Sequence, residues 1–142
     1  MKRILGVDYG TSRIGIALGV GDVVEPYTTL QNKPHHLIEM KAIENVAETA
    51  IEEEVQAVVI GLPLLHGAET SAGKDIRHFG GRIAKLLEGE NIKVAYVDES
   101  KSSKEAISKA VEGGIARKRR GNDHALAACQ IIKRYLQLGP IE

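Results

Sequence analysis

The sequence predicts one α/β domain, built on a mixed sheet of five strands with helices on both faces. Three observations support this fold class. The first 30 residues hold three short apolar segments, and the rest of the chain alternates segments of helical period with apolar runs. The length of 142 residues is that of a single domain, residues 1–142, without repeats or linkers. A hydrophobic content of 43% is enough to build one core.

The N-terminal part is expected to form an antiparallel meander, with strands at residues 3–8, 14–20 and 23–30. Each segment is short, apolar and rich in β-branched residues, and glycine turns separate them. Pro26 cannot donate a backbone hydrogen bond to a neighbouring strand. The third strand is therefore expected to lie at an edge of the sheet or to carry a bulge.

The remaining segments alternate between helix and strand. Apolar residues recur at helical spacing in two segments, and continuous apolar runs follow each of them. Such βαβ crossovers make the later strands parallel. We expect helices at 36–54, 72–88 and 102–112, strands at 55–63 and 92–99, and a last helix from about residue 122.

The composition narrows the functional classes. Lys plus Arg and Asp plus Glu number 19 each, so any nucleic-acid surface must come from local segregation of charge. The chain has no Trp and 4% aromatic residues, which argues against base stacking as the binding mode. Cys129 is the only cysteine, which excludes an internal disulfide and a cysteine-rich zinc site. No apolar run reaches membrane-spanning length, and we expect a soluble, cytoplasmic protein.

Acidic residues stand at three positions where strands end or a helix begins. Asp8 closes the first predicted strand, Glu99 closes the strand at 92–99, and Asp123 opens the last helix. If the two strands are parallel neighbours, both acids leave the same edge of the sheet, where Asp123 can add a third ligand. Clustered carboxylates are typical of a site for Mg²⁺ or Mn²⁺, and two such ions can catalyse phosphodiester hydrolysis.

Each acid also has a structural interpretation of its own. Asp8 can support a turn, Glu99 can be a solvated surface residue, and Asp123 suits the first turn of a helix through the helix dipole. Only the joint placement of the three acids indicates a catalytic site.

A run of four cations precedes the last helix. It comprises Arg117, Lys118, Arg119 and Arg120, within a segment bounded by glycines. Such a run is often a solvated loop, and its place just before Asp123 makes it a candidate for phosphate contacts. Arg13, beside Asp8, is a second candidate for binding a nucleic-acid backbone.

The chain resembles the YqgF-type family of RNase H-like nucleases, described both as Holliday junction resolvases and as pre-16S rRNA processing nucleases. Four segments carry the resemblance: GVDYGTSRIGIA, VVIGLPLLHG, VDESKSSKEA and HALAACQIIKRYL. The resemblance implies an RNase H-like fold and makes Asp8 and Glu99 metal-binding catalytic acids. It also implies a hydrolase that acts on nucleic acid, with ribosomal particles as further partners.

The chain departs from the family pattern at two places. Ser100 stands where the family usually has Arg, which removes a cation expected near the phosphate. Aligning the last helix on its alanines and Tyr135 places His124, not Asp123, at the position of the third acid. Four alternatives remain open: Asp123 reaches the metal, His124 ligates it, His124 transfers protons near neutral pH, or His124 is an inert residue at the start of the helix.

Two other functional classes remain as alternatives. DYGTS resembles the first phosphate loop of the actin and sugar-kinase superfamily, but that architecture uses two such domains and this chain has the length of one. A non-catalytic protein that binds RNA or the ribosome is the second alternative. The sequence leaves open whether the substrate is precursor rRNA or branched DNA, and whether the protein is a monomer or a homodimer.

Overall fold

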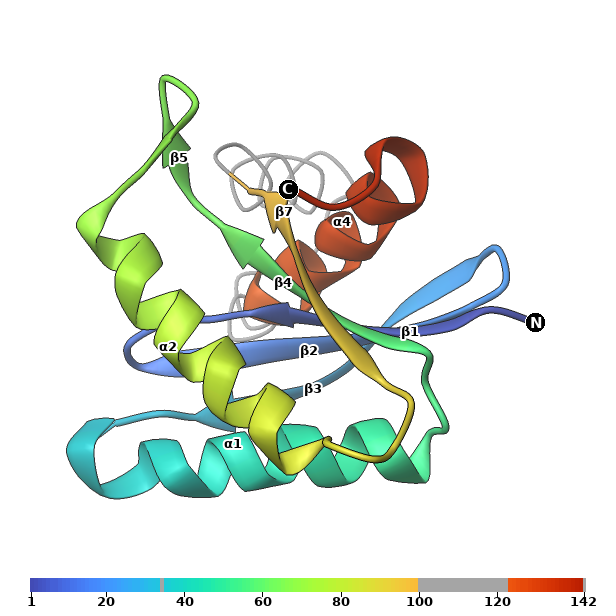
Figure 1. Cartoon of the computed structure of the whole chain (residues 1–142), viewed down its shortest axis with the longest axis horizontal. Helices are drawn as coiled ribbons and strands as arrows, with labels where there is room; N and C mark the ends of the chain where they lie inside the picture. Colours follow the sequence, from blue (N-terminus) through green and yellow to red (C-terminus); the bar gives the residue numbers. More distant parts are fainter. Residues whose placement is uncertain (34, 100–122, 142) are drawn as a thin grey trace.

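The computed structural model describes residues 1–33, 35–99 and 123–141. The main sheet contains five strands: β1 (Arg3–Asp8), β2 (Arg13–Val20), β3 (Val23–Gln31), β4 (Ala57–Leu62) and β7 (Lys93–Asp98). The described residues form three helices that pack on it: α1 (His35–Glu52), α2 (Ser71–Leu86) and α4 (Asp123–Leu138). Figure 1 shows how these elements follow one another along the chain. The predicted helix at 102–112 lies outside the described residues.

The strand order of the sheet is β3-β2-β1-β4-β7. Strands β1, β2 and β3 pair antiparallel, whereas β4 pairs parallel with both β1 and β7. The predicted mixed sheet, with a meander followed by two parallel strands, is confirmed. Of the two conditions set for Asp8 and Glu99 to leave the same edge, β1 and β7 meet one: they are parallel, but they are not neighbours, because β4 lies between them.

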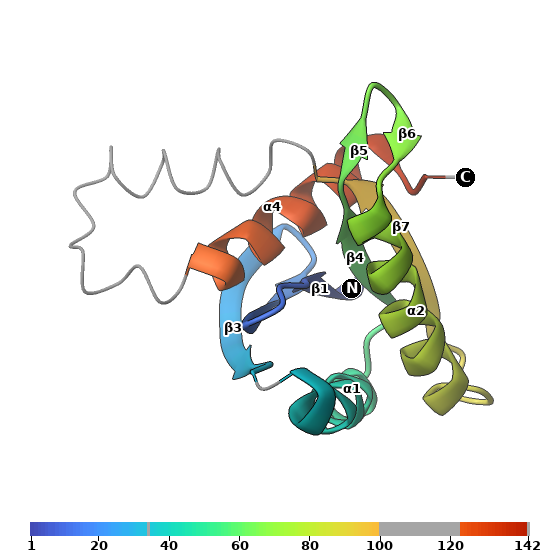
Figure 2. The same cartoon turned by 90° about the vertical axis from the view of Figure 1, so that its left-hand side faces the viewer.

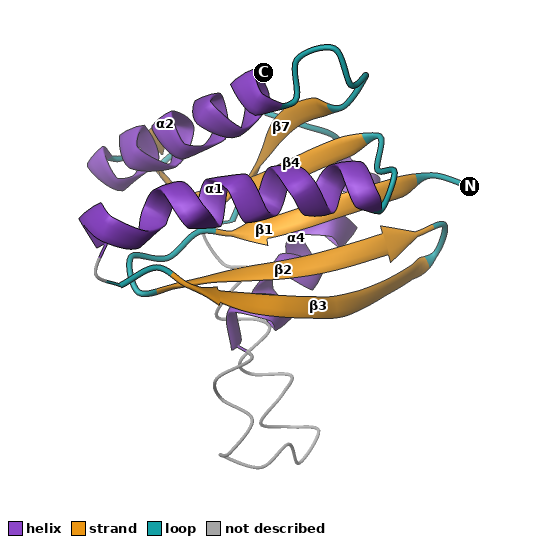
Figure 3. Ribbon diagram, turned by 90° about the horizontal axis from the view of Figure 1, so that it is seen from below, coloured by secondary structure: helices purple, strands orange, loops and turns teal. Residues whose placement is uncertain are grey.

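The third strand has both features that Pro26 predicts. Strand β3 forms one edge of the sheet (Figure 3). Its register against β2 shifts between Ile16 and Ala17, so that Ile16 pairs with Thr28 and Ala17 with Pro26. The shift is a bulge, which accommodates a residue without a backbone N–H.

The helices are divided between the two faces of the sheet. Helices α1 and α2 cover one face, and α4 packs on the other (Figures 2 and 3). Side chains alternate along each strand, so Leu5 and Val7 face α1 and α2, while Ile4 faces α4. The sheet thereby separates two apolar cores, one on each side.

Glycine lets α4 lie close against the sheet. A Cβ atom added to Gly15 of β2 would lie 2.0 Å from the carbonyl carbon of His124, in the first turn of α4. A Cβ on Gly6 of β1 would lie 2.6 Å from the carbonyl oxygen of Ala128. Larger residues at these two positions would push the helix away from the strands. The close approach brings the start of α4 next to the end of β1.

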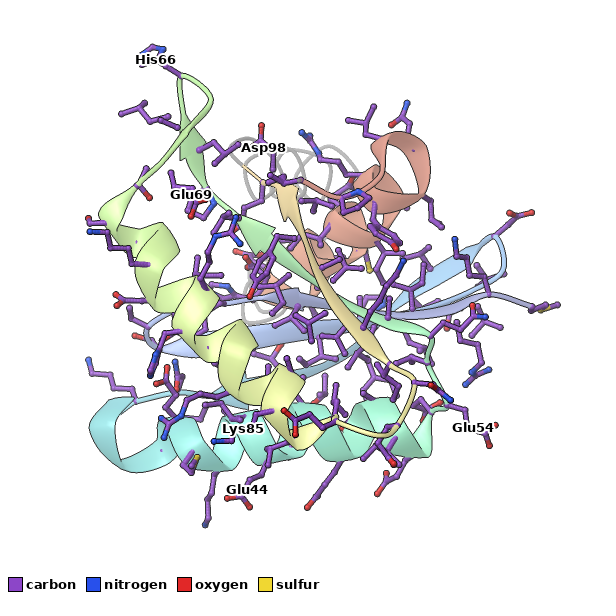
Figure 4. The ribbon with its side chains drawn as sticks, in the orientation of Figure 1. Glu44, Glu54, His66, Glu69, Lys85 and Asp98 are labelled. Carbon is purple, nitrogen blue, oxygen red and sulfur yellow. The ribbon has the colours of Figure 1, made fainter. Side chains whose placement is uncertain are left out.

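A small hairpin was not predicted. Strands β5 (Leu64–Leu65) and β6 (Ala68–Glu69) pair antiparallel between β4 and α2, and His66 lies at the tip (Figure 4). His66 and Gly67 turn the chain with positive φ angles. Two-residue strands are too short to produce a detectable alternation, which explains the miss. Within the described part of the chain, no helix has the length and apolar character needed to span a membrane.

Candidate active site

Two of the predicted acids leave the same edge of the sheet. Asp8 is the last residue of β1 and is only 4% exposed. It follows the alternation of Ile4 and Gly6 and therefore points to the α4 face. Glu99 comes directly after β7, next to Asp98, which Figure 4 marks at the end of that strand. The Glu99 backbone N–H donates a hydrogen bond to Leu62 O (3.2 Å), which fixes its position beside β4.

Gly61 of β4 provides the space through which Glu99 approaches Asp8. Val7 pairs with Ile60, so Gly61 lies level with Asp8 on the intervening strand. A Cβ atom on Gly61 would lie 2.6 Å from both Cδ and Oε2 of Glu99. The carboxyl group of Glu99 thus occupies the place of a missing side chain. No role for Gly61 was predicted, although it lies in VVIGLPLLHG, one of the four segments that carry the family resemblance.

The environment of Glu99 disfavours its negative charge. Burial, followed by repulsion from Asp8 and a hydrogen bond with it, raises the pKa of Glu99 to about 10. The nearby charge of Asp98 acts in the same direction. Glu99 Oε2 is buried and has no hydrogen-bond partner among the described residues. Two carboxyl groups from different strands therefore converge on one poorly solvated point.

His124, in the first turn of α4, contacts Asp8 from the helix that covers this face of the sheet. Its Nδ1 lies 2.7 Å from Asp8 Oδ2. This hydrogen bond raises the pKa of His124 above its usual value, although partial burial of the ring opposes the shift. The His124 side chain remains 38% exposed, so the ring joins the buried Asp8 to solvent.

Asp123 and Arg13 act on this centre through their charges. Asp123, the first residue of α4, raises the pKa of His124, and Arg13 lowers it. Arg13 begins β2 and is exposed. Of Asp123 and His124, the two candidates at the position of the third acid, His124 is the one that the structure places in direct contact with Asp8. The cations of residues 117–120 and Ser100 lie outside the described residues.

Asp8 and Glu99 supply two donors of the kind that a divalent cation prefers. Adjacent carboxyl groups and an unpartnered buried carboxylate oxygen supply hard oxygen donors whose mutual repulsion a cation would relieve. His124 adds a nitrogen donor, which suits Mn²⁺ better than Mg²⁺. Within residues 1–33, 35–99 and 123–141, no group of three or more His, Cys, Asp or Glu side chains is arranged to hold a metal ion.

The fold is that of the RNase H-like class. The chain superposes on Thermus thermophilus RuvC in complex with a Holliday junction substrate with a TM-score of 0.65, at 14% identity, covering 99% of this chain and 100% of that one. The fowlpox virus Holliday junction resolvase gives a TM-score of 0.60 at 15% identity, covering 95% and 97%. At this level of identity, the likeness establishes the fold.

The sequence establishes the family. A sequence model of the RuvX family, described as Holliday junction resolvase, matches residues 2–138. A protein of Sulfurimonas denitrificans, named "Putative pre-16S rRNA nuclease", is 35% identical over 136 residues, which cover 95% of this chain and 97% of the relative. A protein of Endomicrobium trichonymphae with the same name is 32% identical, covering 97% of each chain. The chain belongs to the RuvX family, which confirms the resemblance seen in the sequence.

Proposed function

We propose that this protein is a divalent-cation-dependent nuclease that hydrolyses phosphodiester bonds during 5′-end processing of pre-16S rRNA. The observation that carries the proposal is the convergence of Asp8 and Glu99, from separate strands, on one buried point at the sheet edge. The names of the curated relatives support pre-16S rRNA as the substrate. The protein would act in the cytoplasm on ribosomal precursor particles.

Asp8 and Glu99 would hold the cation, either one ion or a pair, with His124 or Asp123 as a further ligand. When bound, Mg²⁺ or Mn²⁺ supplies Lewis-acid stabilisation of the charge that develops on the phosphodiester oxygens. Asp8 is fixed by its place in β1 and by the hydrogen bond from His124. Glu99 is fixed by the Leu62 hydrogen bond and the space above Gly61. The two carboxyl groups are thereby positioned before substrate arrives.

His124 has a second role open to it. In the tautomer in which His124 Nδ1 donates to Asp8 Oδ2, Nδ1 carries the proton of that hydrogen bond. Nε2 is then the ring nitrogen that can take up or release a proton at the substrate. The ring is partly exposed, which gives it access to the reacting strand. Arg13 and the cations of residues 117–120 would bind the phosphate backbone around this point.

Branched DNA is the second candidate substrate. The family description names Holliday junction resolvase, which favours a four-way junction. A symmetric junction would call for a homodimer, whereas a single-stranded rRNA end can be cut by a monomer. A protein that binds RNA without cutting it is the third alternative.

The deciding experiment is a cleavage assay with wild type and Asp8→Asn. Precursor rRNA and a synthetic four-way junction are each incubated with Mg²⁺, with Mn²⁺ and with EDTA. We expect wild type to cut precursor rRNA only when a divalent cation is present. We expect Asp8→Asn to lower the rate by about a hundredfold or more, since several kcal/mol of transition-state stabilisation are lost.

The other outcomes separate the alternatives. Cleavage of the junction alone would move the substrate to branched DNA. Binding of RNA without cleavage under any of these conditions would contradict the nuclease proposal and favour the non-catalytic alternative. Binding of both substrates by Asp8→Asn, measured in parallel, shows that the variant is folded.

A further inference from the structure

We propose that a polar groove between the start of β2 and the end of β3 is a second nucleic-acid contact, which binds the phosphodiester backbone of the substrate strand beside the acidic centre. The proposal rests on the proposed function, because its ligand is the substrate of that site. The groove has a volume of about 530 Å³. It is lined by Ser12, Arg13, Thr29, Leu30, Gln31 and Lys33.

The groove adjoins the acidic centre. Arg13 pairs with Gln31 and Gly15 pairs with Thr29, so Thr29 and Gln31 lie on the face of the sheet that Gly15 shares with α4. Gly15 touches the first turn of α4, where His124 contacts Asp8. Strand β3 lies at one edge of the sheet, and Glu99 follows β7 at the other edge. A nucleic-acid strand laid across this end of the sheet therefore passes the groove, then Asp8, then Glu99.

The chemistry of the lining fits a polyanion. Arg13 and Lys33 are exposed cations, Ser12 and Thr29 carry hydroxyl groups, and the described residues that line the groove include no carboxylate. Arg, Lys, Ser, Thr and Gln are the side chains that commonly contact nucleic-acid phosphates. In a chain with as many acids as bases, this local excess of positive charge is a segregated patch.

A buried hydroxyl points to an occupant. Thr29 Oγ1 is buried and has no hydrogen-bond partner among the described residues. Buried hydroxyl groups without a partner are disfavoured by about 1–3 kcal/mol, and native structures contain few of them. A rotation of the Thr29 side chain toward the groove would bring this hydroxyl to the surface, where a phosphate or sugar oxygen would give it a partner.

Hydrogen bonds hold the groove open in its observed shape. Asn32 is fully buried, and its Nδ2 donates to Gly10 O at 2.8 Å. Its backbone N–H donates to Ser12 O, also at 2.8 Å. Both bonds tie the end of β3 to the turn that follows Asp8. These bonds connect the groove to the acidic centre, which lowers the reorganisation that binding requires.

The test measures binding separately from cleavage. Wild type, Lys33→Gln and Thr29→Val are titrated against three fluorescent probes: a precursor rRNA fragment, DNA of the same sequence and a four-way junction. Anisotropy is recorded in EDTA between 50 and 200 mM KCl. The matched control is Lys85→Gln, which removes the same charge from α2 on the opposite face of the sheet, where Figure 4 labels Lys85.

We expect Lys33→Gln to weaken binding of the preferred probe by about three- to tenfold. We also expect it to lower the salt slope, which is the slope of the logarithm of the binding constant against the logarithm of the KCl concentration, by about one in magnitude. Thr29→Val is expected to weaken binding by about threefold with an unchanged salt slope, since it removes a neutral donor. Its thermal midpoint should stay equal or rise, because the buried unpartnered hydroxyl is gone. A merely structural Thr29 would instead lower the midpoint and leave the affinity unchanged.

The outcomes distinguish the groove from the nuclease proposal. If wild type binds and cleaves while Lys33→Gln behaves like Lys85→Gln, the groove proposal is overturned and the nuclease stands. If the groove variants weaken binding but wild type never cleaves with Mg²⁺ or Mn²⁺, the groove stands and the nuclease proposal fails. If wild type binds none of the probes, the groove proposal is overturned, and the cleavage assay with Mg²⁺ or Mn²⁺ alone decides the nuclease proposal. The probe that binds most tightly identifies RNA or DNA as the source of the backbone.

Discussion

The two faces of the sheet use the same strands for different purposes. On the face covered by α1 and α2, the strands present bulky aliphatic residues, such as Leu5, Val7 and Ile60, and every one of these is buried. On the face covered by α4, glycines stand among the apolar residues at Gly6 and Gly15. Both faces carry an apolar core, but at Gly6 and Gly15 the second face is in contact with the backbone of a helix instead of with side chains.

The difference teaches how a buried polar site can be built on a small domain. Where side chains are absent, elements approach closely, and polar groups from distant segments can meet. Gly15 admits the start of α4 and with it His124, and Gly61 admits the carboxyl group of Glu99. Both groups then converge on Asp8. Four substitutions test this contrast, in order of expected size.

The largest effect is expected from Gly15→Ala. Its Cβ would meet His124 backbone atoms at 2.0–2.1 Å, and a helix backbone cannot move aside as a side chain can. We expect a loss of about 3 kcal/mol in the free energy of unfolding, measured by urea denaturation. A loss below about 1 kcal/mol would show that close packing of α4 is not what places His124.

Glu99→Gln is expected to stabilise the metal-free protein. The pKa of Glu99 is about 10 in the folded protein against an ordinary 4.5, so folding favours the protonated form. Wild type therefore loses stability as pH rises above about 5, and the Gln variant avoids this loss. We expect a gain of about 2 kcal/mol at pH 8, vanishing near pH 4, in urea melts with EDTA.

The control for this pH dependence is Glu90→Gln, at an exposed position after α2. Its stability should follow that of wild type at each pH. If the free energy of unfolding changed with pH in the same way for Glu99→Gln and wild type, the interpretation that the folded structure disfavours the charge of Glu99 would be contradicted. Added Mn²⁺ should raise the thermal midpoint of wild type and not that of Glu99→Gln.

Gly61→Ala is expected to lower the stability of the protein only slightly but to abolish its binding of Mn²⁺. The atoms that its Cβ would meet belong to the ends of two side chains, Glu99 and Ile131, which can rotate away. We expect a loss of only about 1 kcal/mol in stability. The displaced carboxyl group should nevertheless abolish the Mn²⁺-induced rise in the thermal midpoint. A retained rise would show that Gly61 does not position Glu99.

The smallest effect is expected from Gly81→Ala in α2, on the opposite side of the sheet. An added Cβ there meets nothing within 4 Å. Alanine is a better helix former than glycine, so we expect a gain of about 0.5–1 kcal/mol in urea denaturation. The Mn²⁺-induced rise in the thermal midpoint should equal that of wild type. The same chemical change thus gives three outcomes at three glycines, and a uniform outcome would refute the contrast.

Most of the fold was predictable because its signals are local. The apolar runs and helical periods located all five main strands and the three described helices, with boundaries within a few residues. The edge position of β3 followed from one residue, Pro26, which lacks a backbone donor. The hairpin β5–β6 was missed because strands of two residues carry no periodic signal.

The site was predictable in part. The positions of Asp8 and Glu99 at strand ends predicted that they share an edge, and this holds even though β4 separates their strands. The choice between Asp123 and His124 was not predictable, because neighbouring helical residues point about 100° apart and the rotation of α4 depends on its packing. The catalytic and metal-binding roles of these residues remain predictions.

The sequence by itself determined the order of strands and helices along the chain and the placement of acids at strand ends. Both follow from backbone propensity and side-chain period, which act over a few residues. Only the tertiary structure decided that His124 contacts Asp8, 116 positions earlier in the chain, and that Gly61 provides the space for Glu99. These contacts depend on how closely α4 and the strands pack, and packing distance is a property of the assembled core rather than of any single segment.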